Sequence, residues 1–351
     1  MLKPSGPGIY DIIQAFRGVN SSFLTDQHVP GADLTGKWII ITGSNNGIGF
    51  EAAKSLAAMG ANMILACRNP PAWEMHPTAA VEECQTISNA QGHSSTIEWW
   101  EIDMADFDSV EEFCARWIKC DRPLDILCNN AGVAPPAQDI VTKDGFEMAH
   151  QVNLLSQVLI TLRLLPSLAR SAEPRIVCTT SCIHHLGLFD LDHFHGGPWK
   201  KGNDYQDNKL YYQMWVIELQ SRLLRHPEYL HITVNGVNPG FVASSIWTPL
   251  TTATDLPTHV LKLLLRFFAI TPQQGSLAIT HAATSPELGP DPHTQRVGAP
   301  NGRGGGKYIN RIWEAPARSI CYDAEARSAI WTKLDEELKL RDKGLLDVLG
   351  L

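Results

Sequence analysis

Short apolar runs alternate with longer amphipathic segments along most of this chain, and this alternation constrains the fold more than any other feature. Apolar runs unbroken by charge are typical of strands covered on both faces. The predicted strands are 37–42, 61–67, 96–102, 124–128, 175–180 and 231–237, and the predicted helices are 50–59, 78–90, 107–118, 146–170 and 205–224. Repeated β-α-β units of this length predict an α/β fold, a parallel sheet with helices on both faces. No repeat or linker divides the chain, so we expect a single domain.

The composition argues against several classes of protein. The 351 residues carry 29 Lys or Arg and 37 Asp or Glu, a net charge of −8, so no nucleic-acid partner is expected. Eight cysteines stand singly, none in a Cys-x-x-Cys pair, which indicates reduced thiols in a cytoplasmic protein. We recognise neither a signal peptide nor an apolar run of about 18 residues, the length that a spanning helix needs.

Segments outside the alternating pattern set the expected boundaries. Residues 1–35 are expected to form an N-terminal arm with a short helix at 10–16. Residues 36–318 are expected to form the main domain, and residues 319–351 a helical tail with a helix at 323–340. Asp108 is the expected cap of the helix at 107–118.

Two segments of the main domain interrupt the alternation. Residues 244–271 place Leu261, Leu264, Leu265 and Phe268 at helical spacing, which predicts either a packed surface helix or a lid over an apolar substrate. A membrane-surface helix is the less favoured interpretation, because the segment has only two cations. Residues 285–306 are rich in Gly and Pro and predict a mobile loop. Its Gly304-Gly305-Gly306-Lys307 sequence does not make a phosphate-binding loop, because Tyr308 replaces the Ser or Thr that binds magnesium.

A glycine-rich turn joins the first predicted strand to the first helix of the series. Glycines at 43, 47 and 49 allow a tight turn and a close approach to a pyrophosphate, and the helix N-terminus offers free N–H groups. A tight turn without a ligand is the alternative. The cofactor-binding residues predicted at this turn and after the next strands are Gly43, Ser44, Asn46, Gly47, Ile48, Gly49, Asp103, Met104, Asn130, Ala131 and Gly132.

The end of the second predicted strand bears on the choice of cofactor. An acidic residue there would accept hydrogen bonds from the ribose hydroxyls of NAD. The chain has Cys67-Arg68-Asn69 instead, and the guanidinium of Arg68 suits the 2′-phosphate of NADP. The sequence therefore predicts NADP(H) as the cofactor; a surface ion pair of Arg68 is the alternative.

Polar side chains from distant parts of the chain form a candidate catalytic set. Tyr205 and Lys209 lie one helical turn apart on one face. A free phenol has a pKa of about 10, and a nearby ammonium, helped by a cationic nicotinamide, is expected to lower it. Ser181 follows the fifth strand and is placed to polarise a substrate carbonyl. Asn153, inside the long helix, is expected to hold a water that links Lys209 to solvent.

These motifs, in this order, resemble the short-chain dehydrogenase/reductase superfamily over about residues 34–318. The residues that carry the resemblance are Thr42-Gly43-x-x-x-Gly47-Ile48-Gly49, Asn129-Asn130-Ala131-Gly132, Asn153, Ser181, Tyr205-x-x-x-Lys209 and Pro239-Gly240. Residues 66–68, 144–148, 175–177 and 306–308 are similar to the retinol-dehydrogenase-like branch and its fungal relatives. The resemblance implies a Rossmann-type doubly wound sheet and hydride transfer from NADPH.

The resemblance also implies roles for individual residues. Asn153, Ser181, Tyr205 and Lys209 are implied to be the catalytic tetrad, with Tyr205 and Lys209 also contacting the cofactor. Further cofactor contacts are implied for Pro239, Gly240, Val242 and Ser244. The chain departs from the family pattern at Asn69, Ser156, Thr180 and Ser244, and none of these changes removes a group that hydride chemistry needs.

The sequence thus predicts an oxidoreductase that interconverts a carbonyl and an alcohol on a hydrophobic small molecule, such as a polyketide, terpenoid, steroid or retinoid. Tyr205 would give the proton and NADPH the hydride. The expected substrate contacts are His184, Trp247, Leu261 and Leu265. We expect a monomer or homodimer with at most weak association with a membrane surface.

Three other interpretations are weighed against this one. The same fold could catalyse a non-redox step, such as dehydration, epimerisation or cyclisation. A non-enzymatic nucleotide-sensing scaffold is disfavoured, because all four tetrad residues are present. The histidines and aspartates between 182 and 204 suggest a metal site, but their spacing matches no ligand pattern, so no metal is expected.

Overall fold

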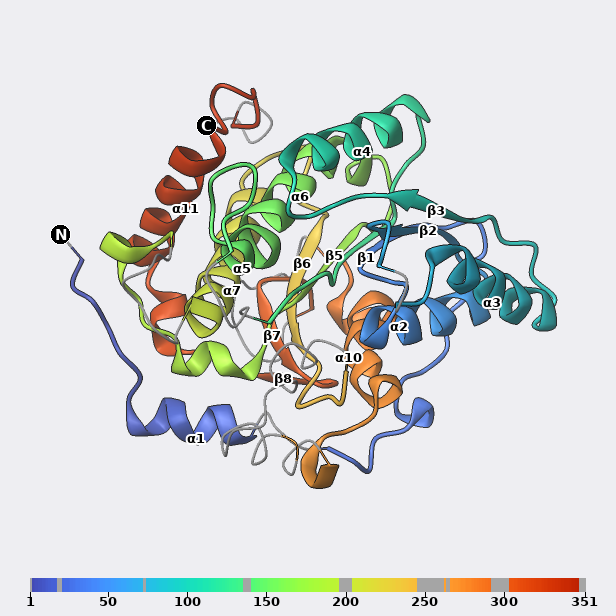
Figure 1. The fold of residues 1–351 in the computed structure, drawn as a ribbon, viewed down its shortest axis with the longest axis horizontal. Coiled ribbons are helices and arrows are strands. Elements are labelled where there is room, and N and C mark those ends of the chain that lie inside the picture. The colour runs from blue at the N-terminus through green and yellow to red at the C-terminus, as the bar shows by residue number, and fades with distance from the viewer. Residues whose placement is uncertain are drawn as a thin grey trace.

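The apolar runs of the sequence form one eight-stranded sheet in the computed structural model (Figure 1). The structure describes residues 2–17, 21–71, 74–134, 140–195, 204–244, 262, 266–291 and 303–346. The strand order is β3-β2-β1-β4-β5-β6-β7-β8. The strands are β1 (Trp38–Thr42), β2 (Asn62–Cys67), β3 (Ile97–Glu101), β4 (Ile126–Asn129), β5 (Arg175–Thr179), β6 (Thr233–Asn238), β7 (Lys307–Asn310) and β8 (Trp313–Ala315). All neighbours pair in parallel except β7 and β8, which are antiparallel.

Helices cover both faces of the sheet, which confirms the predicted α/β class. One layer contains α2 (Gly47–Ala58), α3 (Pro77–Ala90) and α10 (Pro272–Thr284). The other contains α4 (Phe107–Lys119), α6 (Ser156–Leu168), α7 (Asp204–Leu223) and α11 (Ala324–Leu338). Successive residues of β1 point to opposite layers: Ile40 belongs to the α6–α7 core, whereas Ile39 and Ile41 belong to the α2–α10 core. The continuous apolar run of β1 is therefore required by burial on both faces.

The structure modifies several local predictions. The long helix at 146–170 consists of α5 (Met148–His150), a π-helical turn (Gln151–Leu155) and α6. Asp106, not Asp108, caps α4: its carboxylate accepts from the backbone N–H groups of Asp108 and Ser109, so the predicted cap was wrong. The prediction also omitted β7, β8 and α10. The lid segment is described only at residues 244, 262 and 266–271, and residues 292–302 of the expected loop lie outside the described residues.

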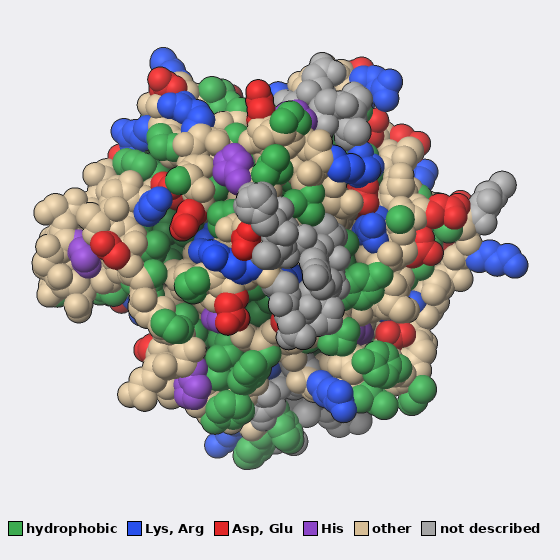
Figure 2. Space-filling view, turned by 180° about the vertical axis from the view of Figure 1, so that it is seen from behind, with side chains coloured by type: hydrophobic (Ala, Val, Ile, Leu, Met, Phe, Trp, Pro, Cys, Tyr) green, Lys and Arg blue, Asp and Glu red, His purple; other side chains and the backbone are tan. Residues whose placement is uncertain are grey.

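Both terminal segments pack on the domain. The arm carries α1 (Ile9–Arg17), and Ser5 pairs with Phe189 through two backbone hydrogen bonds. In the tail, α11 lies on α7, where the Arg327 guanidinium donates to Glu218. None of the helices in the described part of the chain combines the length and apolarity that crossing a bilayer requires. On the face shown in Figure 2, basic and acidic side chains are interspersed.

Candidate active site

A cleft of 570 Å³ lies along the carboxyl ends of β1, β2, β3 and β4. In parallel sheets this is the edge where ligands bind. Twelve of the predicted cofactor-binding residues line the cleft: Gly43, Asn46, Gly47, Ile48, Gly49, Arg68, Asp103, Met104, Asn130, Ala131, Gly132 and Ser244. Ser44 does not line it: the Ser44 hydroxyl is buried and donates to the Ile41 carbonyl, so its role is to hold the turn.

The glycine turn is packed too tightly for side chains at two positions. A Cβ atom at Gly49 would lie 2.4 Å from both the Asn130 amide nitrogen and the Gly43 carbonyl oxygen. Gly43 has φ +65°, and its Cβ would lie 2.9 Å from the Cα of Ala131. Asn46 caps α2 by accepting from the Gly47 N–H at 2.7 Å. The turn therefore brings bare backbone and a helix N-terminus to the cleft, which is the arrangement that binds a pyrophosphate.

The loop after β4 is fastened to this turn by hydrogen bonds. The Asn130 side chain donates to the carbonyl oxygens of Thr42 (3.0 Å) and Gly43 (3.1 Å). In return, the Thr42 hydroxyl accepts from the backbone N–H groups of Asn130 and Ala131, both at 2.9 Å. The two loops that border the cleft consequently form one rigid unit.

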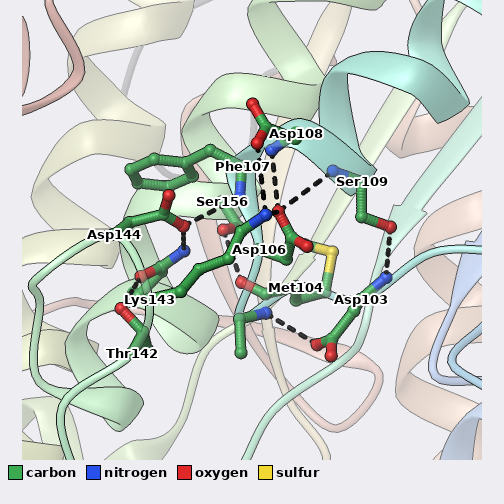
Figure 3. A network of polar contacts seen from close by, with 12 residues as sticks. Asp103, Met104, Asp106, Phe107, Asp108, Ser109, Thr142, Lys143, Asp144 and Ser156 are labelled. Carbon is green, nitrogen blue, oxygen red and sulfur yellow. Dashed lines mark hydrogen bonds and ion pairs between the residues drawn. The ribbon is translucent and has the colours of Figure 1, made fainter.

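The loop after β3 carries Asp103, which lines the cleft. Figure 3 shows the polar contacts around this loop. The Asp103 carboxylate accepts from the Ala105 N–H at 2.9 Å, and the Asp103 N–H donates to the Ser109 hydroxyl. The Ser156 hydroxyl is fully buried and donates to the Met104 carbonyl at 2.6 Å. Ser156, one of the departures from the family pattern, therefore ties α6 to the cofactor cleft.

Arg68 and Glu74 share the cleft at the end of β2. The Arg68 Nη2 atom lies 3.0 Å from the Glu74 Oε1 atom. The ion pair expected as the alternative is therefore present, and Arg68 also lines the cleft; its binding of a 2′-phosphate stays a prediction. Glu74 was not predicted, because it lies beyond the strand in a loop without a motif.

Lys209 is anchored at the end of β5. Its Nζ atom donates to the Thr179 carbonyl at 2.8 Å and lies 5.6 Å from the ring centroid of Tyr205 and 5.9 Å from that of Tyr212. Burial lowers the pKa of Lys209 to about 8. Burial also raises the pKa of Tyr205, opposite to the lowering expected, so Lys209 alone does not produce a phenolate in this structure.

Ser181 follows β5 and begins the short helix Cys182–Leu186, where its hydroxyl accepts from the Ile183 N–H at 3.3 Å. The end of this helix abuts α7: a Cβ at Gly187 would lie 2.7 Å from the Gln206 carbonyl oxygen. Because α7 also carries Tyr205 and Lys209, the fold brings three of the four tetrad candidates to the end of β5.

His184 lies behind Ser181 and is fully buried. Its Nε2 atom accepts from the Arg318 N–H at 3.3 Å, so Nδ1 carries the proton and donates to the Ser181 carbonyl at 2.6 Å. Burial keeps the pKa of His184 well below its ordinary value, consistent with a neutral ring. Both ring nitrogens of His184 thus have partners within the protein, and its contact with a substrate stays a prediction. Trp247, Leu261 and Leu265 lie outside the described residues.

Asn153 lies in the π-helical turn and joins it to the loop after β4. Its side chain accepts from the Val133 N–H (2.8 Å) and donates to the Val133 carbonyl (2.9 Å). These two hydrogen bonds use one amide N–H and one oxygen lone pair of Asn153, and the expected water contact stays a prediction. Gln157 adds a second link, because its amide donates to the carbonyls of Ala131 and Val152. π-Helical turns are frequent at functional sites.

The turn after β6 contains the remaining predicted contacts. Ser244 lines the cleft, whereas Pro239, Gly240 and Val242 are not among its lining residues. A Cβ at Gly240 (φ +96°) would lie 2.2 Å from the Cζ atom of Arg311, so the buried guanidinium supports this turn. Within the described residues, no group of three His, Cys, Asp or Glu side chains could hold a metal ion.

Comparison with known proteins agrees with this geometry. The family model described as short chain dehydrogenase matches residues 37–255, which include the glycine turn, the cleft and the tetrad candidates. The chain belongs to the short-chain dehydrogenase family. Within this family it falls in the retinol-dehydrogenase-like branch.

The similarity to individual short-chain dehydrogenases extends over most of the chain. Human retinol dehydrogenase 11 is 35% identical over 266 residues, covering 73% of this chain and 75% of the relative. Human polyprenol dehydrogenase is 29% identical over 342 residues, covering 96% and 93%. An uncharacterized oxidoreductase of Schizosaccharomyces pombe is 32% identical over 298 residues, covering 80% and 81%.

Solved structures share the fold of this short-chain dehydrogenase. A protein of Mycobacterium paratuberculosis superposes with a TM-score of 0.61 at 22% identity, covering 90% of this chain and 97% of that one. The NADPH-dependent 3-quinuclidinone reductase of Rhodotorula rubra gives a TM-score of 0.56 at 16% identity, covering 80% and 92%.

Proposed function

We propose that this short-chain dehydrogenase is an NADP(H)-dependent oxidoreductase that interconverts a carbonyl and an alcohol on a hydrophobic small molecule. The observation that carries the proposal is the anchoring of Lys209 on the Thr179 carbonyl, with its Nζ atom beneath the ring of Tyr205. Ser181 is only two residues beyond Thr179, and the cofactor cleft lies along the same edge of the sheet. A phenol, an ammonium and a hydroxyl are the groups that carbonyl reduction requires.

The cleft fits a dinucleotide. The tight packing around Gly49 and Gly43 leaves backbone atoms that would hold a pyrophosphate, and Asp103, which lines the cleft, would accept from an adenine amino group. Arg68 supports NADP(H) over NAD(H), because a guanidinium pairs well with a 2′-phosphate. Glu74 opposes that preference, because its carboxylate already pairs with the same guanidinium.

The chain's own residues have distinct tasks in the proposed reaction. A bound nicotinamide cofactor supplies or accepts the hydride. Tyr205 donates its phenolic proton to the carbonyl oxygen, and the Ser181 hydroxyl donates a hydrogen bond to the same oxygen. The Lys209 ammonium, held by the Thr179 carbonyl, stabilises the phenolate that the proton leaves behind. Burial alone raises the pKa of Tyr205, so this stabilisation has to come from Lys209 and the cationic form of the cofactor together.

The proposed substrate class rests on the relatives and the segment after β6. Two relatives are named for retinol and polyprenol, both apolar alcohols. The expected lid carries Leu261, Leu264 and Leu265. Phe267 and Phe268, at its described end, expose more than half of their side-chain surface. A hydrophobic ketone, aldehyde or alcohol is the class that such side chains would bind.

We further propose a monomer in the cytoplasm. The surface of α7 is covered by α11, with Arg222 over the Trp331 ring at 4.1 Å and Arg327 on Glu218, so that surface is not open to a second subunit. All eight cysteines are unpaired, which supports a reducing compartment.

Replacing Tyr205 with Phe tests the assigned chemistry. We expect turnover of hydrophobic ketones with NADPH to fall by roughly a hundredfold or more, while NADPH binding is retained. Tyr212→Phe is the matched control: its ring is about as far from Lys209, but Tyr212 is 1% exposed and faces the core. Loss of turnover in Tyr212→Phe with full activity in Tyr205→Phe would overturn the assignment. A product of unchanged oxidation state, with no change in NADPH absorbance, would favour the non-redox alternative.

A further inference from the structure

Helix α1 is amphipathic, but its apolar face points to solvent and its polar face points to the body of the protein. In a helix packed on a soluble protein the apolar face points inward, but in α1 the large apolar side chains point to solvent. Ile9 is 76% exposed, Ile13 46% and Phe16 72%, and Tyr10 and Ile12 are also exposed. The body of the protein is contacted instead by Asp11 and the small side chain of Ala15.

This outward orientation is held by specific contacts and is not the result of a loose terminus. The Asp11 carboxylate lies 3.8 Å from the Arg318 Nε atom and 3.9 Å from the His185 Nδ1 atom. The same carboxylate accepts from the Gly8 N–H at 2.8 Å. Upstream, the Arg318 guanidinium also donates to the backbone of Ser5. The chain therefore uses its polar groups to hold an apolar face toward the outside.

Further apolar side chains lie at the same edge of the molecule. Residues 266–268, the loop around Phe23 and strand β8 all lie toward the lower edge of Figure 1, as α1 does. Phe267 is 67% exposed, and the ring of Phe23 packs at 5.9 Å from that of Trp313. Hydrophobic side chains gather along the lower edge in the view from behind as well (Figure 2). We call this set the apolar rim: Ile9, Tyr10, Ile12, Ile13, Phe16, Phe23, Phe267, Phe268 and Trp313.

Three cations lie beside the apolar rim although the whole chain carries −8. Two acidic residues also lie there, and each has a partner: Glu314, next to Trp313, pairs with Lys307, and Asp26, near Phe23, accepts from Gln273. Arg17 ends α1, and Lys262 and Arg266 lie beside Phe267, with Arg266 at 5.9 Å from the Phe267 ring. Within the described residues, none of these three cations pairs with a carboxylate. A rim of apolar side chains flanked by free cations is complementary to an anionic bilayer surface.

We propose that the apolar rim docks this protein on the surface of an anionic phospholipid bilayer. Apolar side chains of α1 would enter the boundary between headgroups and acyl chains, with Arg17, Lys262 and Arg266 at the headgroup phosphates. A second copy of the chain is a poorer occupant, because a two-fold contact between identical rims would bring these cations close to their own copies. Docking would also bring the short helix Cys182–Leu186 near the membrane, because His185 in that helix faces Asp11 on α1.

Vesicle binding of the full chain tests this inference without any assay of catalysis. The probes are vesicles of phosphatidylcholine alone and vesicles that also contain phosphatidylserine, used in flotation and in titration. We expect binding to the anionic vesicles and a drop of roughly tenfold or more in the partition coefficient for the double variant Ile13→Ser/Phe16→Ser. Arg17→Glu should weaken binding to the anionic vesicles. The matched controls Ile118→Ser and Lys119→Glu change exposed residues of α4, away from the rim, and should bind like the wild type.

Each outcome bears on the proposal. Failure of the wild type to bind either vesicle would overturn it, and so would equal binding by the rim variants and the wild type. A concentration-dependent dimer that is lost in Ile13→Ser/Phe16→Ser, without vesicle binding, would assign the rim to a second copy instead. Circular dichroism of each variant confirms that the fold is retained. If the wild type shows no redox activity, the proposed function is contradicted. The result of the vesicle-binding test does not depend on that outcome.

Discussion

Glu74 and Arg68 form an ion pair inside the cofactor cleft, with 3.0 Å between Oε1 and Nη2. The Glu74 side chain is 15% exposed and the Arg68 side chain 55%, so the carboxylate is the more fixed partner. A 2′-phosphate that approaches Arg68 therefore meets a carboxylate already in contact with that guanidinium.

Glu74→Gln is expected to strengthen NADPH binding by roughly threefold to tenfold, because it removes a negative charge beside the phosphate. NADH binding should stay within about twofold of the wild type, since NADH has no phosphate there. Fluorescence titration with both dinucleotides measures the difference. Glu51→Gln, which changes a carboxylate of α2 that does not line the cleft, is the control. Weaker NADPH binding by Glu74→Gln would show that Glu74 orients Arg68 and does not oppose the phosphate.

Gly49→Ala is expected to damage both stability and cofactor binding. The added methyl group would lie 2.4 Å from the Asn130 amide and the Gly43 carbonyl, so the two loops that border the cleft must separate. Crowding of this kind typically costs about 1–3 kcal/mol. Urea denaturation and NADPH titration measure the two effects. Gly31→Ala has nothing within 4 Å of the added atom and should change neither; an unaltered Gly49→Ala protein would contradict the tight contact.

The sheet and its ligand-binding edge could be predicted because they depend on local patterns. The run Ile39-Ile40-Ile41 is buried on both faces, and the glycines of the turn are fixed by backbone contacts. By contrast, β7 and β8 were missed because Gly and Pro surround them and β8 is short and exposed. The cap of α4 was placed two residues late because Asp106 and Asp108 are the same residue type. Only the backbone conformation distinguishes them: Asp106 is extended, whereas Asp108 already lies in the helix.

The finer parts of the site depend on contacts that are distant in sequence. Glu74 reaches Arg68 across a loop, and no spacing rule predicts which carboxylate does so. His184 was expected at the substrate because it follows Ser181, but the packing of His185 and Tyr308 around its ring buries it. The raised pKa of Tyr205 results from burial, which the Tyr-x-x-x-Lys spacing does not reveal.

Glu337→Gln is expected to lower stability most at mildly acid pH. His150 is buried between the Glu337 carboxylate (2.8 Å) and the Asn208 side-chain oxygen (2.7 Å). Burial lowers the pKa of His150, but the ion pair with Glu337 outweighs it, so the pKa is raised above 6.5. The charged pair therefore contributes its full stability below pH 6.5, and the contribution is lost as pH rises through the raised pKa.

Urea denaturation of the wild type and of Glu337→Gln, measured from below pH 6.5 to above it, tests whether the stability difference falls as pH rises. The wild type should exceed Glu337→Gln by about 1–3 kcal/mol at the acid end, and the difference should shrink as pH rises. Glu336→Gln is the control, because that carboxylate is 59% exposed and pairs with surface Lys333. A difference that grows with pH would show that His150 is not charged in the folded protein.

Lys209→Met is expected to abolish turnover. It should also remove the part of the pH dependence of the unfolding free energy that Lys209 causes. Burial lowers the pKa of Lys209 from 10.5 to about 8, which corresponds to roughly 3 kcal/mol of cost for the charged form. Between these values the unfolded chain binds more protons than the folded one, so the wild type gains stability as pH rises from 8 to 10.5. Below pH 8 the ammonium is charged in the folded protein, and the full free-energy cost of burying that charge is present.

The wild type should therefore gain about 2–3 kcal/mol relative to Lys209→Met between pH 7 and pH 10, as measured by urea denaturation. Both proteins share their other titrating groups, so the difference isolates Lys209. The Thr179 carbonyl, which the variant leaves without its donor, adds an offset that does not change with pH. Lys333→Met, at a lysine that is 37% exposed, should show no such slope. A constant difference for Lys209→Met would mean that the ammonium is well solvated in the folded protein, and the site would then lack the buried cation on which the proposed role of Tyr205 depends.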